Sequence, residues 1–267
     1  MIPLSKSTKI ISSKGDRGTF EIEALYPGYG YTVGNSLRRV LLSSLEGAAA
    51  TQAKIKGAPH EFSTLPGMKE DVLSLLLNLK QIRFRLFEQG PVTVTLKVKG
   101  IKTITAGDFK PPSQVEIVNK DLVLAHLTDK SAELEIEIQV GKGVGYEVAE
   151  SRRRGKEEIG TISLDAIYGP VKKVSYRVEQ MRVGDRTDFD RLILEIETDG
   201  TLNPEAALKE ASSILVKQFE IAGEGLKTEE VKPEEKPKVK KKVASSATRR
   251  GDGKPAVKKK AAVKKKK

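Results

Sequence analysis

GYGYTVGNSLRRVLLSSLEG, which spans residues 28–47, is the stretch on which the fold depends. Behind its opening glycines, apolar side chains recur at a spacing typical of a helix, namely at Leu37, Val40, Leu41, Leu42 and Leu45. At about 100° per residue they spread over roughly 200° of the helix circumference, about twice the width that contact with one core needs. The stretch therefore predicts a helix with two apolar surfaces, one for its own core and one for a second partner.

The glycines of this stretch bear on where the helix begins and on what it could bind. Asn35 can cap the first turn and Gly47 can adopt the left-handed conformation that ends a helix, so we expect the helix to run from about Gly34 to Gly47. GYGYTVG also invites comparison with a dinucleotide-binding loop. However, its third glycine lies one position later than GxGxxG requires, and no acidic residue follows a second strand at the right distance, which argues against a nucleotide site.

Residues 203–222 predict a second helix with a wide apolar surface. Asn203 can cap it, Pro204 suits its first position and Glu205 suits its first turn. Glycines at 223 and 225 are expected to end it, and its apolar stripe consists of Ala207, Leu208, Ala211, Ile214, Leu215, Phe219, Ile221 and Ala222. Two such helices favour a shared dimer core, although a monomer that buries each helix on both sides would show the same pattern.

Much of the remaining chain alternates between apolar and polar residues, which predicts short strands. The clearest case is ELEIEIQV at 133–140, where apolar residues share one face and glutamates occupy the other, as is typical of antiparallel sheet with one solvated face. A short buried helix is expected at 69–80, entered through Glu70 and Asp71, whose charges suit the helix dipole. The sequence thus predicts an α+β fold.

Composition excludes several classes of protein. The chain of 267 residues has no cysteine, which excludes disulfides, thiolate metal sites and a cysteine nucleophile. No run of about 18 apolar residues occurs and the first residues do not resemble a signal peptide, so we expect a soluble, cytoplasmic protein. The net charge of +12 lies entirely in residues 227–267, which hold 17 basic and 5 acidic residues. Because residues 1–226 are formally neutral, the charge does not indicate a nucleic-acid-binding fold.

The lysine-rich tail at 227–267 has no aromatic residue and few apolar ones, so we expect it to be disordered. Its lysine runs suit sequence-independent contacts with phosphate groups through release of counterions. A tail that only keeps the protein in solution is the alternative. A basic-tailed protein that binds nucleic acid on its own is accordingly one functional hypothesis.

A metal-dependent enzyme is another hypothesis, and it rests on Asp185, Asp188 and Asp190. Carboxylates two residues apart share one face of an extended chain and could bind Mg²⁺. Arginines flank these aspartates, however, and aspartate is common in turns that lead into a strand. The two histidines, His60 and His126, lie far apart with no acidic cluster beside either in the sequence. We therefore expect no metal site and no cofactor.

Several long stretches, in the same order, resemble the N-terminal assembly domain of bacterial RNA polymerase alpha subunits. These stretches are GYGYTVGNSLRRVLLSS, HEFSTLPGMKEDVLSLLLNLK, VEIVNKDLVLAHLT, GKGVGYEVAE and RVGDRTDFDRLILEIETDGTLNPEAALKEASSIL, and the resemblance covers residues 5–226. Agreement of several motifs in one order is far more specific than a single glycine or aspartate pattern. The resemblance implies a dimerisation subdomain at 1–46 plus 170–226, with a mostly β subdomain inserted at 47–169.

The resemblance also implies a function without catalysis. Alpha subunits form a homodimer that serves as the platform for the assembly of DNA-directed RNA polymerase, a nucleotidyltransferase. One copy contacts the β subunit and the other the β′ subunit, with omega and sigma in the wider complex. The expected role is therefore that of an assembly subunit in transcription.

Residue roles follow from matched positions. The resemblance assigns the dimer seam and subunit core to Leu37, Val40, Leu41 and Leu45 of the first helix and to Leu208, Ala211, Leu215 and Phe219 of the second. It assigns the β contact to Arg39, Leu42, His60, Glu61, Gly67, Arg186 and Asp188. It assigns the β′ contact to Lys80 and Leu164.

The C-terminus departs from the pattern of this family. Alpha subunits usually continue through a linker to a small helical domain that binds DNA, whereas only the lysine-rich tail follows here. We expect this tail to give weak, non-specific contact with DNA or RNA in place of that domain. A salt series that compares DNA binding with and without residues 227–267 would test this expectation.

Overall fold

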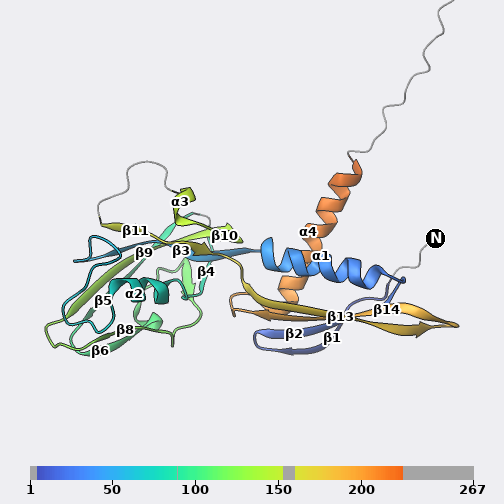
Figure 1. Cartoon of the computed structure of the whole chain (residues 1–267), viewed down its shortest axis with the longest axis horizontal. Coiled ribbons are helices and arrows are strands. Elements are labelled where there is room, and N and C mark those ends of the chain that lie inside the picture. Colours follow the sequence, from blue (N-terminus) through green and yellow to red (C-terminus); the bar gives the residue numbers. More distant parts are fainter. Residues whose placement is uncertain (1–4, 89, 153–159, 225–267) are drawn as a thin grey trace, which may run out of the picture. The chain divides into compact units, whose positions relative to one another are not determined.

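The computed structural model describes residues 5–88, 90–152 and 160–224, in which strands outnumber helices (Figure 1). Its helices are α1 (Tyr29–Ser43), α2 (Val72–Leu79), α3 (Ala149–Arg152) and α4 (Pro204–Glu224), and a 3-10 turn covers Ala106–Asp108. Its strands are β1 (Lys9–Lys14), β2 (Arg17–Leu25), β3 (Glu46–Ile55), β4 (Phe84–Leu86), β5 (Val92–Lys99), β6 (Lys102–Thr105), β7 (Val115–Ile117), β8 (Val123–Leu127), β9 (Glu133–Val144), β10 (Tyr146–Glu147), β11 (Thr161–Ser163), β12 (Ala166–Ile167), β13 (Val171–Val183) and β14 (Arg186–Thr198). The predicted α+β class is confirmed. Within these ranges no helix is both long and apolar enough to cross a membrane.

The first sheet combines strands from both ends of the described chain, in the antiparallel order β1-β2-β14-β13. β13 and β14 form a long hairpin in which Val174 lies opposite Ile196. α1 and α4 pack on this sheet and against each other (Figure 1). The core that they enclose consists of Phe20, Leu37, Leu41, Leu45, Val171, Val174, Leu194, Ile196, Ala207, Leu208 and Ala211.

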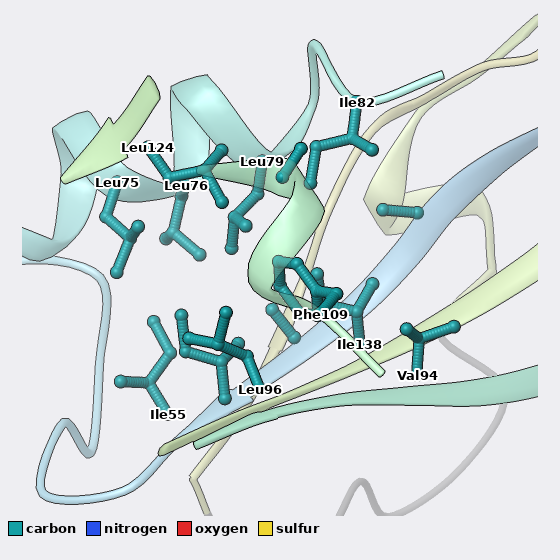
Figure 2. Packing of buried hydrophobic residues seen from close by; sticks show 14 of the residues in the cluster. Ile55, Leu75, Leu76, Leu79, Ile82, Val94, Leu96, Phe109, Leu124 and Ile138 are labelled. Atoms are coloured by element: carbon teal, nitrogen blue, oxygen red, sulfur yellow. The ribbon is translucent and has the colours of Figure 1, made fainter. Parts of the chain in front are cut away.

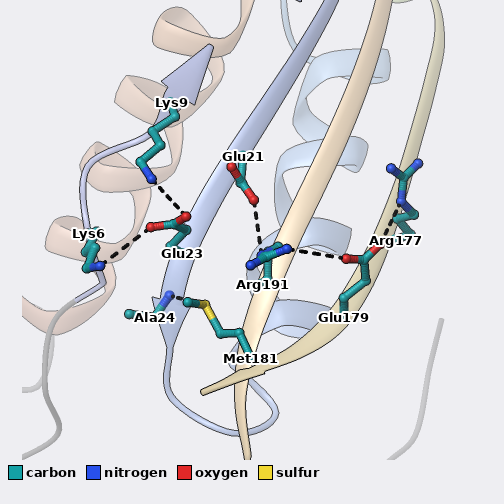
Figure 3. A network of polar contacts seen from close by, with 9 residues as sticks. All are labelled: Lys6, Lys9, Glu21, Glu23, Ala24, Arg177, Glu179, Met181 and Arg191. Atoms are coloured by element: carbon teal, nitrogen blue, oxygen red, sulfur yellow. Dashed lines mark hydrogen bonds and ion pairs between the residues drawn. The ribbon is translucent and has the colours of Figure 1, made fainter. Parts of the chain in front are cut away.

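The opposite face of this sheet is charged and carries cross-strand ion pairs (Figure 3). Arg191 on β14 lies 3.1 Å from Glu21 on β2 and 3.8 Å from Glu179 on β13. Arg177 extends the network to Glu179 at 3.1 Å. Such half-exposed pairs contribute little to stability. They do show that much of this face is open to solvent, although Ile193 on the same face is buried.

The second sheet has the order β5-β9-β3-β4-β7, with β11 paired to β3. α2 covers it, and the leucines Leu75, Leu76 and Leu79 point from the helix toward Leu96 and Ile138 on the strands (Figure 2). This core is separate from the first one and draws its buried residues from positions 50–164. The predicted subdomain boundaries at 46/47 and 169/170 stay a prediction, which the two cores support.

A pair of glycines makes room for an aromatic ring where β3 leaves the first core. Gly47 and Gly143 lie opposite each other in the β3–β9 pair, and Tyr168, which is 5% exposed, packs on both. A Cβ on Gly143 would penetrate the Tyr168 ring, and one on Gly47 would overlap the Tyr168 carbonyl oxygen. Only glycine therefore fits at these two positions.

Arg85 on β4 and Arg83 just before this strand bind the loop between β14 and α4, and we call this contact the arginine clasp. The Arg85 guanidinium donates from Nε to the carbonyl of Thr201 at 3.0 Å and from Nη2 to the carbonyl of Gly200 at 3.2 Å. Arg83 lies 3.6 Å from the buried carboxylate of Asp199. The clasp thus ties the second sheet to the residues that lead into α4.

The predicted bounds of the first helix are wrong at both ends. α1 begins at Tyr29, behind Gly28 in a left-handed conformation at φ 86°, and Asn35 lies inside the helix instead of capping it. The helix ends at Ser43, with Ser44 as its cap. Gly47 does not end the helix, because it is already part of β3, where the close approach of Tyr168 explains the glycine.

The other two predicted helices agree better with the structure. α2 begins at Val72, and its cap is Asp71, whose carboxylate accepts the Ser74 backbone N–H at 2.8 Å. α4 begins at Pro204 as predicted and continues through Gly223. Gly225 and the whole tail at 227–267 lie outside the described residues.

Candidate assembly surfaces

A buried carboxylate of the first sheet holds the start of α1. Oδ2 of Asp190, a residue that is 7% exposed, accepts the backbone N–H groups of Gly28 at 2.9 Å and Gly30 at 3.0 Å. These N–H groups belong to the first turn, where helices lack internal acceptors. The anion also lies at the positive end of the helix dipole. Asp190 therefore fixes where the helix begins and where it lies on the sheet.

Glycines inside α1 let the helix approach the sheet closely. A Cβ at Gly30 would lie 2.7 Å from Val178, and one at Gly34, a turn later, would lie 2.8 Å from the Tyr176 ring. From the sequence, Gly30 was expected to precede the helix and Gly34 to begin it, so this packing role was missed. The signal that could have revealed it was their spacing of four residues, which places both on one face of a helix.

The predicted dimer residues divide between the core and the surface. Leu37, Leu41, Leu45, Leu208 and Ala211 are at most 8% exposed and fill the core of the single chain. Val40 and Leu215 are partly buried against that core. Phe219 is 67% exposed, so it alone of the predicted set has most of its surface free for a second copy.

The second half of α4 presents further apolar side chains to solvent. Val216 is 54% and Ile221 64% exposed, beside Phe219. A groove of about 670 Å³ runs along the same helix and is closed on its other side by Thr8, Ile10 and Phe20. α4 is thus buried at its start and exposed at its end.

Arg39 and Leu42 lie on the exposed side of the last turns of α1. Leu42 is 40% exposed, and Arg39 forms no ion pair within the described part of the chain. Both predicted β-contact residues on this helix are therefore accessible.

Arg186 and Asp188 lie together at the tip of the β13–β14 hairpin. The guanidinium donates to both carboxylate oxygens, at 3.0 and 2.7 Å, and lies over the rings of Tyr26 at 5.6 Å and Phe189 at 5.2 Å. The Arg186 guanidinium lowers the pKa of Asp188 below its ordinary range. The two side chains stay half exposed, so the tip presents a preformed ion pair.

The predicted contact loop before α2 contains His60, Glu61 and Gly67. The His60 ring lies 3.2 Å from the Ser63 hydroxyl, and Gly67 has a left-handed φ of 77°. Phe62, whose sequence pattern gave no sign of a contact role, is 74% exposed in this loop. α1, this loop and the hairpin tip are separate elements, so the predicted β-contact residues form three groups.

The acidic residue at the entrance of α2 has a partner that the sequence did not indicate. Glu70 accepts the His126 backbone N–H at 2.7 Å and contacts its ring Nδ1 at 2.5 Å. Burial alone would raise the pKa of Glu70, but these hydrogen bonds outweigh it and lower the pKa below the ordinary value. Glu70 thus anchors the loop to His126 on β8. In the fold, one carboxylate therefore lies beside this histidine, although none does in the sequence.

Lys80 and Leu164, the predicted β′-contact residues, belong to one structural cluster. The Lys80 ammonium lies 2.9 Å from Asp165, and the Leu164 side chain is 5% exposed in the second core. Arg152 donates to the Leu164 carbonyl, and Ala149 donates its backbone N–H to Asp165 at 3.0 Å. Any contact with a partner here would involve the partly exposed side chains around Lys80 and Asp165, since the Leu164 side chain faces inward.

The Lys80–Asp165 pair predicts a dependence of stability on pH. The Ala149 N–H and then Lys80 lower the pKa of Asp165 below its ordinary value of 3.8, so the stabilisation is complete above that pH and is lost below it. We expect Asp165→Asn to lower the free energy of unfolding by about 1 kcal/mol at neutral pH and by much less at about pH 3. Urea titrations at both pH values measure this. An exposed control, Asp121→Asn, is expected to leave the unfolding midpoint unchanged; an equal loss at both pH values for Asp165→Asn would contradict the assignment.

The aspartates of the metal hypothesis are not gathered into a site. Asp188 is bound to Arg186, and Asp190 is bound to the start of α1. Asp185 is exposed and lies 3.9 Å from Arg182. Among the residues that the structure describes, no three histidine or acidic side chains are grouped as a metal site would need.

Comparison with known proteins finds similarity to one family. A family model described as the RNA polymerase Rpb3/RpoA insert domain matches residues 53–169. The chain is 50% identical over 208 residues to the DNA-directed RNA polymerase subunit alpha of Bifidobacterium adolescentis, and 48% identical over 208 residues to that of Leifsonia xyli subsp. xyli. Each match covers 78% of this chain and 62% of the relative, so the chain spans less than two thirds of their length. Over the region that it shares with these relatives, the chain is similar to DNA-directed RNA polymerase alpha subunits, and residues 53–169 match their insert domain.

Proposed function

We propose that this chain is a non-catalytic assembly subunit of DNA-directed RNA polymerase, and that it acts as a homodimer. The observation that carries this proposal is the exposed end of α4. A helix that is anchored in its own core and then leaves Val216, Phe219 and Ile221 in solvent is typical of a surface that a partner covers. The groove beside it offers a place for a second copy, and burial of such side chains would supply the free energy of association.

The exposed polar groups support capture of the large subunits by the dimer. Arg39 with Leu42, the loop at 60–67 and the Arg186–Asp188 pair are accessible, and the last two are held by defined contacts, so we assign all three groups to the β subunit. Preformed contact residues cost less entropy on binding than mobile ones. The rim around Lys80 is assigned to β′. Omega and sigma would join the complex that these contacts build, and the tail would add a weak contact with nucleic acid.

The dimer is tested with matched serine variants of the full chain. Ile221 on α4 and Ile101 on the β5–β6 turn are 64% and 63% exposed, so their truncation differs only in location. We expect Phe219→Ser and Ile221→Ser each to raise the dimer dissociation constant at least about tenfold, which corresponds to about 1.4 kcal/mol. Ile101→Ser is expected to have no effect. Sedimentation equilibrium measures the constants.

Two results would contradict the proposal. A wild-type chain that sediments as a monomer at micromolar concentration, or α4 variants as dimeric as the Ile101→Ser control, would reject the dimer. Unchanged co-purification of β with Arg39→Ala would reject the assigned β contact.

A further inference from the structure

A patch of exposed apolar side chains surrounds the C-terminal end of α1. With Leu42 excepted, none of its members belongs to the contact groups assigned above. Each is between 40% and 60% exposed, and together they form what we call the ribbon patch: Leu42, Val144, Tyr146, Val148 and Ile167. Single exposed apolar residues are ordinary, but several in contact on one surface indicate a binding site.

Backbone pairing places the central members of this patch next to one another. Tyr146 on β10 lies directly opposite Ile167 on β12, and Val144 lies opposite Glu46, the first residue of β3. A Cβ on Gly145 would lie 3.3 Å from the Ser43 carbonyl oxygen at the end of α1. The two-stranded ribbon of β10 and β12 therefore lies against the last turn of the helix that carries Leu42.

The ribbon is held rigidly, so the patch exists before any partner binds. Tyr168 donates its backbone N–H to the carbonyl of Gly145 at 2.9 Å, and its ring is seated on Gly47 and Gly143. Asp165 holds the next turn through the N–H of Ala149. A preformed surface loses little conformational entropy on binding.

Charges at the border of the patch indicate the chemistry of its partner. Arg39 lies one turn before Leu42 on α1, and Arg38 precedes it; both are exposed and form no ion pair within the described ranges. Glu46 is exposed near the centre, and Glu147 is engaged by the Tyr168 hydroxyl at 3.3 Å. An apolar centre with unpaired arginines at one side suits a polypeptide that offers apolar side chains and a carboxylate.

We propose that the ribbon patch is a docking surface for an apolar, carboxylate-bearing segment of the subunit that binds Arg39 and Leu42. This inference rests on the proposed function, in which that subunit is β. It extends the contact from the end of α1 across β10 and β12. Tyr146 and Ile167 form its centre, because they are paired across the ribbon and an aromatic side chain in such a position contributes strongly to binding.

The test uses the full chain co-purified with β. We expect Tyr146→Ser and Ile167→Ser each to weaken β binding at least about tenfold, while the dimer dissociation constant stays as in the wild type. Thermal unfolding is expected to stay as in the wild type for Ile167→Ser, whereas Tyr146→Ser also removes a hydrogen bond to Asp165. Ile101→Ser, on an exposed turn of the second sheet, is the control and is expected to bind β normally. A photo-crosslinking amino acid in place of Tyr146 is expected to yield a covalent adduct with β.

The outcomes separate this inference from the proposed function. If Arg39→Ala weakens β binding while both patch variants retain wild-type affinity, the docking surface is rejected and the proposed β contact stands. If the patch variants shift the monomer–dimer equilibrium and leave β binding intact, the partner is a second copy and the inference is overturned. If Arg39→Ala and both patch variants bind β normally, the inference and the β contact fail together.

Discussion

Gly47→Ala is expected to destabilise the chain by more than about 3 kcal/mol, the largest effect of any single methyl group that we predict. The added Cβ would overlap the carbonyl oxygen of Tyr168, which is a backbone atom and cannot rotate away. Relief would require β3 to separate from the segment that carries Tyr168, and this movement would also unseat the ring from Gly143. Urea unfolding followed by circular dichroism measures the loss.

Gly169→Ala is the matched control for this change. Its Cβ would lie 3.8 Å from the Leu42 carbonyl oxygen, an ordinary van der Waals contact, so we expect the unfolding midpoint to change little. Equal midpoints for the two alanine variants would show that the backbone around Gly47 and Tyr168 can move to admit the Cβ, and the steric argument would then be wrong.

Asp190→Ala is expected to lower the free energy of unfolding by about 2–4 kcal/mol. The substitution leaves the buried N–H of Gly30 and the partly buried N–H of Gly28 without their acceptor, and an unsatisfied buried donor costs about 1–3 kcal/mol. It also removes the anion from the positive end of the helix dipole. We expect the loss to be local first, with amide hydrogens of residues 29–36 exchanging faster than those of α4.

Asp188→Ala is the control for this second prediction. Asp188 lies two residues earlier on β14 and pairs with Arg186 in solvent, where ion pairs contribute little. We expect its unfolding midpoint to stay near that of the wild type. Protection of residues 29–36 that is unchanged in Asp190→Ala would contradict the anchoring role.

The accuracy of the helix predictions depends on where each helix finds its cap. α4 was predicted to begin at Pro204, and it does, because Asn203, Pro204 and Glu205 are adjacent in the chain. The start of α1 was predicted five residues too late. Its acceptor, Asp190, lies 162 residues from Gly28, so no local pattern could reveal it.

Patterns of apolar residues predict burial but not the partner. Leu41 and Phe219 belong to stripes of the same spacing, yet Leu41 is 0% and Phe219 67% exposed. A core within one chain and a seam between two chains require the same side chains, so the sequence could not separate them. The sequence also could not predict that Arg186 lies over the Tyr26 ring, because the two residues are 160 positions apart in the chain.

The arginine clasp has a consequence for how the chain unfolds. The second core is connected to the first by two covalent crossings, through β3 and through the segment after Tyr168, and two crossings that lie side by side would act as a hinge. Hydrogen bonds from Arg85 to the carbonyls of Gly200 and Thr201 add a third attachment and block rotation about that hinge. The two cores are then expected to unfold in one cooperative transition, so calorimetry on the chain should record a single heat-capacity peak. Without the arginine clasp, the two cores would unfold separately and give two peaks.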